Sequence, residues 1–148
     1  MRALILTLAV AGAALAACGP SNAPPMVQAL DAWCRPAPEG ALSAACYLTL
    51  TSNGDDRLVS VATPAADKAE VHTMSMDGGI MRMAPLADGL ALPRNKAVAL
   101  TPGAEHLMLV GPRETFSEGR TISLTLTFEK APAMTISATV RPAPLPGG

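Results

Sequence analysis

The 148-residue chain has few charged and few aromatic side chains, 16% and 3% of the sequence, and a formal net charge of -1. It contains no Lys/Arg-rich run and no basic segment interleaved with aromatic residues, so it lacks the electrostatic pattern of a nucleic-acid-binding protein. It contains no Gly-x-Ser-x-Gly or phosphate-binding loop, no Ser-His-Asp or Cys-His arrangement, and its carboxylates are scattered. We therefore expect neither a nucleic-acid partner nor an enzyme.

The N-terminus has the pattern of an export signal. The stretch MRALILTLAVAGAALAAC has one Arg, then an apolar run too short to span a bilayer comfortably, and ends in small residues before Cys18. The Leu-Ala-Ala-Cys ending is similar to the lipobox of bacterial lipoproteins. It predicts a signal peptide over residues 1–17 and lipidation of Cys18. The alternative is an ordinary signal peptide cleaved at Ala-x-Ala.

The remaining chain predicts one domain on a lipid anchor. Residues 18–26 are polar and contain Pro, as a short tether would. Residues 27–141 are long enough for a single domain with its own core, and residues 142–148 are expected to be a flexible tail. We expect a monomer in the periplasm, anchored to a bacterial membrane and contacting that membrane only through the lipid.

The cysteine count fits an oxidising compartment. With Cys18 used for lipid, Cys34 and Cys46 remain, an even number. They fall on successive predicted strands joined by a Pro/Gly-containing connection, so we expect a disulfide between them. Two small buried thiols are the alternative, because free cysteines are often buried.

The domain is predicted to be all-β. Short runs rich in Val, Leu, Thr and Ile recur between Gly, Pro, Asn and Asp, and no stretch sustains a helical period. In TISLTLTFE the alternation puts Ile122, Leu124, Leu126 and Phe128 on one face, as for a strand with one face in the core. The pattern favours an antiparallel two-sheet β-sandwich, with a barrel as the alternative. The expected strands are 27–35, 46–51, 57–62, 70–76, 79–83, 97–100, 106–110, 121–128 and 134–140.

Half of the eight methionines lie in the stretch EVHTMSMDGGIMRM. An Asp77-Gly78 hairpin loop would place them on one face of two paired strands, together with one of the two histidines. The pairs predicted by that loop are Met76 with Gly79, Met74 with Met81, and His72 with Met83. The other histidine, His106, shares a strand face with Met108.

A set of histidines and methionines suits copper(I). Thioether sulfur is a soft, uncharged donor that binds Cu(I) well, and neutral imidazole binds Cu and Zn. Zinc sites draw instead on Cys, His and carboxylates. A single methionine at period two is more often core filler, but core packing gives no reason to pair both histidines with methionines at two-residue spacing.

The sequence from about residue 31 to 129 resembles the periplasmic copper chaperones of the PCuAC family. Their pattern is a His, a Met eleven positions later and a downstream His-x-Met, and AEVHTMSMDGGIMRM, GLALP and LTPGAEHLMLVG are similar to their framework. One loop, in APLADG, is one residue longer than the commonest family spacing. The pattern falls on His72, Met83, His106 and Met108.

The resemblance implies a cupredoxin-like β-sandwich that carries one Cu(I) for cytochrome c oxidase assembly or periplasmic copper homeostasis. Its partner would be a copper-accepting protein such as an oxidase subunit or another copper chaperone. Met74, Met76 and Met81 are candidate secondary ligands or a transfer route, with packing as the alternative. The other function classes are an electron-transfer cupredoxin and a metal-free lipoprotein acting as an adhesion or assembly module.

Overall fold

The computed structural model describes residues 22–144, so the predicted signal peptide, Cys18 and residues 145–148 lie outside the described part. The described residues form ten β-strands, and no helix among them has the length and apolar character to cross a membrane. The strands are β1 (Val27–Cys34), β2 (Ser43–Ser52), β3 (Asp56–Ala62), β4 (Ala66–Asp77), β5 (Ile80–Pro85), β6 (Leu90–Leu92), β7 (Ala97–Leu100), β8 (His106–Pro112), β9 (Thr121–Phe128) and β10 (Met134–Val140).

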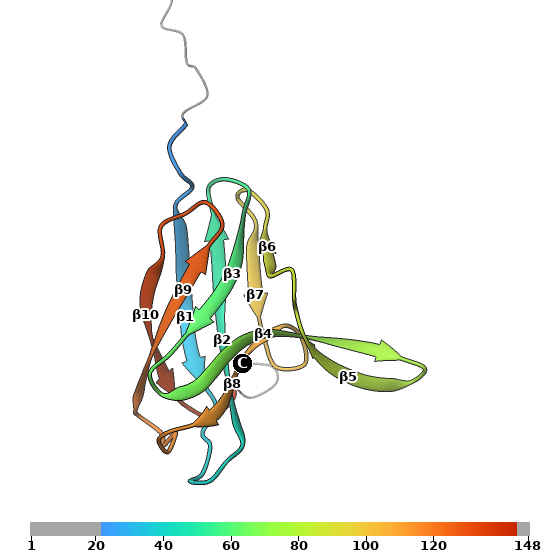
Figure 1. Cartoon of the computed structure of the whole chain (residues 1–148), viewed down its shortest axis with the longest axis vertical. Helices are drawn as coiled ribbons and strands as arrows, with labels where there is room; N and C mark the ends of the chain where they lie inside the picture. The colour runs from blue at the N-terminus through green and yellow to red at the C-terminus, as the bar shows by residue number, and fades with distance from the viewer. Residues whose placement is uncertain (1–21, 145–148) are drawn as a thin grey trace, which may run out of the picture.

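The strands close into a flattened ring, which gives the sandwich of Figure 1. The hydrogen-bonded order β4-β8-β2-β1-β10-β9-β3 returns to β4 through the pairing of Val61 with Ala69. The predicted all-β sandwich in a single domain is confirmed. The ladders between strands are antiparallel, as expected, except that β1 pairs with β10 in parallel. These two strands come from opposite ends of the domain and need no tight turn between them.

β6 lies in a segment that the sequence pattern assigns to a loop. Its three residues stand between Gly89 and Pro93, too short a stretch for alternation to be recognised. The strand exists because Leu90 and Leu92 pair with β3 and are buried in the core.

The core contains the predicted apolar face of β9. Ile122, Leu124, Leu126 and Phe128 are all buried, as the alternation predicts, and they pack in the same cluster as Leu50 of β2. Fully burying a side chain of this size contributes about 1.5–3 kcal/mol relative to leaving it exposed. Burial of this face therefore makes a large contribution to stability.

Cys34 and Cys46 are opposite each other in the β1–β2 ladder and are joined by a disulfide. Both are fully buried. The bond closes a short loop, with a sequence separation of 12, and such a loop contributes roughly 2–3 kcal/mol to stability. It fixes the start of β2 beside β1.

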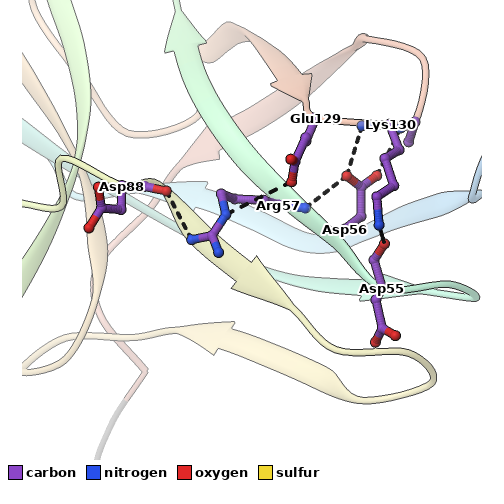
Figure 2. A network of polar contacts seen from close by, with 7 residues as sticks. Asp55, Asp56, Arg57, Asp88, Glu129 and Lys130 are labelled. Atoms are coloured by element: carbon purple, nitrogen blue, oxygen red, sulfur yellow. Dashed lines mark hydrogen bonds and ion pairs between the residues drawn. The ribbon is translucent and has the colours of Figure 1, made fainter.

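A buried carboxylate ties the β9–β10 turn to β3 (Figure 2). Asp56 accepts hydrogen bonds from the backbone N–H groups of Arg57 (2.8 Å), Lys130 (2.9 Å) and Ala131 (2.8 Å). Around it, the Arg57 guanidinium donates to the Asp88 carbonyl, and the Lys130 ammonium donates to a backbone carbonyl one residue before Asp56. The sequence pattern treats this stretch only as a chain break, so its anchoring role is a finding of the structure.

Candidate metal centre

The β4–β5 hairpin turns at Gly78 and Gly79, one position later than predicted. Both glycines have positive φ, 57° and 80°, which a two-residue type I′ loop requires at both central positions. Glycine adopts this conformation without a Cβ clash, so Gly-Gly fills both central positions more easily than Asp-Gly does. The ladder is therefore shifted by two positions from the predicted one, and the three predicted pairs are wrong. The observed pairs are Met76 with Met81, Met74 with Met83, and His72 with Pro85.

A shift of two residues leaves every side chain on its predicted face, because strand side chains alternate with period two. The four methionines of the hairpin share one face with His72. The opposite face carries Ser75, Asp77 and Arg82, and Arg82 Nε lies 3.3 Å from an Asp77 carboxylate oxygen. Ile80, the partner of Asp77, is an exposed apolar residue on that face. The hairpin thus has a thioether face and a mainly polar face.

The end of this hairpin projects from the sandwich as an arm (Figure 1). All six residues of β5 are exposed, and so is Met76 on β4. Core packing therefore does not explain Met76, Met81 or Met83, which removes the main alternative to a ligand role for them.

At the base of the arm the two histidines meet. His72 of β4 and His106 of β8 are direct partners in the ladder, and their ring centroids are 5.9 Å apart. His106 is buried, and the side chain of His72 is only 12% exposed. Two strands far apart in sequence thus bring both imidazoles of the chain to one place.

The hydrogen bond of His106 leaves one ring nitrogen free. Its Nδ1 lies 2.9 Å from the carbonyl oxygen of Ala104. A carbonyl oxygen only accepts, so Nδ1 carries the proton and Nε2 keeps its lone pair. The nitrogen available to a metal ion is therefore Nε2.

His72 has the opposite arrangement. Its Nε2 lies 3.3 Å from a carboxylate oxygen of Glu70, and its Nδ1 is buried without a hydrogen-bond partner. Hydrogen bonds from Lys68 and His72 hold the pKa of the Glu70 carboxyl below its usual value, so the ionised group accepts the Nε2 proton. An unpartnered buried nitrogen is costly, and here its lone pair faces no protein donor. The nitrogen available to a metal ion is Nδ1.

Met83 and Met108 lie on β5 and β8, the two strands that flank His72. Met83 pairs with Met74, two residues after His72, and Met108 pairs with Glu70, two residues before it. Each thus starts from a diagonal position, about 7–8 Å from His72. A methionine side chain, with three rotatable bonds, can span such a gap. The register does not make Met83 and Met108 neighbours of each other.

Three further residues at the site escaped the sequence analysis. Glu70 shares the face of His72, a relation that period-two alternation alone could have revealed. Trp33 and Tyr47, the only Trp and Tyr of the chain, stack with ring centroids 4.6 Å apart, and Tyr47 lies 6.4 Å from His106. Both aromatic residues are buried outside the main core cluster. Nothing in the sequence links them to the histidines, because the connection runs through the pairing of β2 with β8.

Residues 27–140 match the family described as "LpqE-like: Putative lipoprotein LpqE-like". The chain belongs to the LpqE-like family. This LpqE-like chain is 27% identical over 115 residues to "Putative lipoprotein Lxx21020" of Leifsonia xyli subsp. xyli (strain CTCB07), covering 78% of this chain and 69% of that protein. It is 28% identical over 108 residues to "Uncharacterized protein RP573" of Rickettsia prowazekii (strain Madrid E), covering 70% of this chain and 60% of that protein.

Solved PCuAC structures share the fold of this LpqE-like protein. The copper-bound PCuAC domain from PmoF2 aligns with a TM-score of 0.64 and 28% identity, covering 80% of this chain and 93% of that chain. The apo PCuAC domain from PmoF1 aligns with a TM-score of 0.65 and 25% identity, covering 80% and 94%. The Cu(I) form of DR1885 from Deinococcus radiodurans aligns with a TM-score of 0.63 and 27% identity, covering 82% and 81%. The resemblance to the PCuAC family is confirmed.

The side chains that could donate to a metal ion at the base of the arm of this LpqE-like protein are two imidazoles, with thioethers at diagonal positions in the ladder. Within residues 22–144, no three His, Cys, Asp or Glu side chains form a group that could hold a metal ion. Cys34 and Cys46 are bound to each other, so the described part of the chain offers no thiolate. Imidazole with thioether is the donor combination that suits Cu(I).

Proposed function

We propose that this LpqE-like protein is a copper(I) carrier of the bacterial envelope, with His72, His106, Met83 and Met108 holding the ion. The observation that supports this most strongly is the pair of free imidazole lone pairs at the base of the methionine arm. Nδ1 of His72 is buried without a partner, and Nε2 of His106 is left free by the bond to Ala104.

A carrier must bind its cargo and also release it. All four proposed ligands are uncharged, so none of them neutralises the positive charge of Cu(I). A partner that offers a thiolate or additional donors can therefore bind the ion more tightly and remove it. Met83 is exposed on the arm, whereas His106 is buried, so the ion would be reachable from the arm side. We propose a copper-accepting partner such as a cytochrome c oxidase subunit or another copper chaperone, contacted by a monomer, and a role in transport rather than catalysis.

Replacing Met83 with leucine is expected to weaken Cu(I) binding at least about 10-fold. Losing a residue that only hydrogen-bonds to a metal ligand already costs about 10-fold, and Met83 is a proposed direct ligand. Leucine keeps the apolar volume, so the fold should survive. Anaerobic competition with a Cu(I) chelator measures the affinity. Met134→Leu on β10 and Met26→Leu, an exposed methionine outside the arm, serve as controls. Wild-type affinity in Met83→Leu would remove Met83 from the site.

Glu70 is expected to act through His72 by accepting its Nε2 proton. Glu70→Leu removes the acceptor and should weaken Cu(I) binding by about 10-fold to 100-fold, whereas Glu70→Gln keeps an acceptor oxygen and should restore most of the affinity. The same chelator competition measures both variants. If Glu70→Leu and Glu70→Gln had equal affinities, the carboxylate would not position the imidazole.

Two other functions compete with the carrier role. An electron-transfer cupredoxin needs a Cys thiolate beside two histidines, and the disulfide occupies both described cysteines. A metal-free adhesion or assembly lipoprotein would have no use for the free lone pairs. An anaerobic Cu(I) titration separates the three: the carrier binds Cu(I) without colour, the electron-transfer protein shows an intense visible thiolate band on oxidation, and the metal-free protein binds nothing.

We also propose that the protein is lipid-anchored in the periplasm through Cys18. The apolar signal and the Leu-Ala-Ala-Cys ending support this, as does the lipoprotein description of the matching family. Mass spectrometry of the protein purified from membranes should find a mature chain that begins at a lipid-modified Cys18. An unmodified N-terminus at another residue would contradict the anchor.

A further inference from the structure

The outer half of the methionine arm carries thioether groups that the proposed copper site does not use. Met76 and Met81 are direct partners in the ladder beside the turn, with 68% and 56% of their surface exposed. Hydrophobic burial of these two side chains therefore contributes little to stability. Large apolar side chains exposed at a projecting tip also lower the solubility of a protein. Core packing therefore does not account for these two thioether side chains.

We propose that Met76 and Met81 form a second site for a soft monovalent cation, Cu(I) or Ag(I), at the tip of the arm. Side chains of directly opposed residues start about 4.5–5.5 Å apart, so two flexible thioethers can converge on one ion. The nearest side chain on the same face is Met74, two residues along β4, which can supply a third sulfur.

The polar face of the arm does not compete for the ion. Asp77 is the carboxylate nearest the turn, but it lies on the opposite face and pairs with Arg82. The tip face therefore offers only soft, neutral donors, which bind Mg²⁺, Ca²⁺ and Mn²⁺ poorly. With fewer donors and no imidazole, the tip site binds more weakly than the histidine site.

The next pair on this face, toward the sandwich, is Met74 with Met83, and after it come His72 and His106, which are partners in the β4–β8 ladder. Soft donors thus recur every two residues from the tip to the buried histidines. An ion captured at the tip can move inward from one pair of donors to the next. This transfer rests on the proposed function, whereas binding of an ion at the tip is independent of it.

The test uses Ag(I), which is air-stable and has the same preference for soft donors, titrated in chloride-free buffer into the mature protein. Native mass spectrometry counts the ions, and NMR of ¹³C-methyl methionines locates them. The wild type should bind two ions, the second shifting the Met76 and Met81 methyl signals. Met76→Leu/Met81→Leu should bind only one, and Met26→Leu, a methionine of matched 66% exposure, should still bind two.

Two results would overturn the tip site: a double leucine variant that still binds two ions, or a wild type that binds one ion with both tip methyl signals unmoved. Failure of the histidine site gives a different pattern. If a variant lacking both imidazoles kept the tighter ion while Met76→Leu/Met81→Leu still lost one, the tip site would stand and the proposed histidine site would be wrong.

Discussion

His72→Gln and His106→Asn are each expected to weaken Cu(I) binding at least about 100-fold. Losing a residue that only hydrogen-bonds to a metal ligand costs up to about 100-fold, and losing the ligand itself should cost at least as much. The choice of amide follows from the hydrogen bonds. The amide of Gln lies near the position of Nε2, so His72→Gln can still donate to Glu70 while Nδ1 is lost. The amide of Asn lies near the position of Nδ1, so His106→Asn can still donate to Ala104 while Nε2 is lost.

These substitutions separate a ligand role from a structural one. Because each variant keeps the hydrogen bond of the native histidine, its thermal unfolding midpoint should stay near that of the wild type. Anaerobic chelator competition then measures the affinity of a folded protein. A variant that unfolds normally and binds Cu(I) like the wild type would show that its missing nitrogen is not a ligand.

The second large effect concerns stability. Asp56→Ala is expected to lower the free energy of unfolding by at least about 3 kcal/mol, because three backbone N–H groups around a buried carboxylate lose their acceptor. Asp56→Asn should cost less, about 1–3 kcal/mol, since one oxygen can still serve Arg57 and Lys130 while the new amide opposes the N–H of Ala131.

Urea denaturation measures both Asp56 variants, and Asp88→Asn is the matched control. Asp88 is exposed and gives only its backbone carbonyl to the network of Figure 2, so removing its charge should change stability by under about 0.5 kcal/mol. Equal midpoints for Asp56→Ala and Asp88→Asn would mean that Asp56 does not anchor the β9–β10 turn.

The face of the site could be predicted from the sequence, but its pairing could not. Alternation fixes which side chains share a face, and the predicted register was wrong by two, an even number, so the methionines stayed with His72. An error of one residue would have put them on the opposite face. Asp77-Gly78 and Gly78-Gly79 are both credible turn pairs, and only the backbone conformation distinguishes them.

The chemistry of each histidine also required the structure. Sequence spacing pairs His72 and His106 with methionines, but it does not say which ring nitrogen is free. That depends on Glu70 for one ring and on the Ala104 carbonyl for the other. The neighbourhood of Tyr47 depends in the same way on β2 pairing with β8, a contact between distant segments.

The exposure of the arm gives a physical reason for the methionines. In a core, methionine fills irregular gaps, and leucine replaces it at little cost. On an arm that buries little, the same change leaves stability nearly untouched and removes only the sulfur. Leucine substitutions at Met76, Met81 and Met83 therefore report on soft-metal binding with little interference from folding.

The central claim is that two imidazoles and two thioethers hold one copper(I) ion, and X-ray absorption at the copper edge tests it most directly. The mature protein, loaded anaerobically with one equivalent of Cu(I), should show a copper(I) edge and both nitrogen and sulfur neighbours, two of each. In Met83→Leu the sulfur contribution should fall while the nitrogen contribution remains. A spectrum with only nitrogen and oxygen neighbours, or with only sulfur, would contradict the assignment of His72, His106, Met83 and Met108.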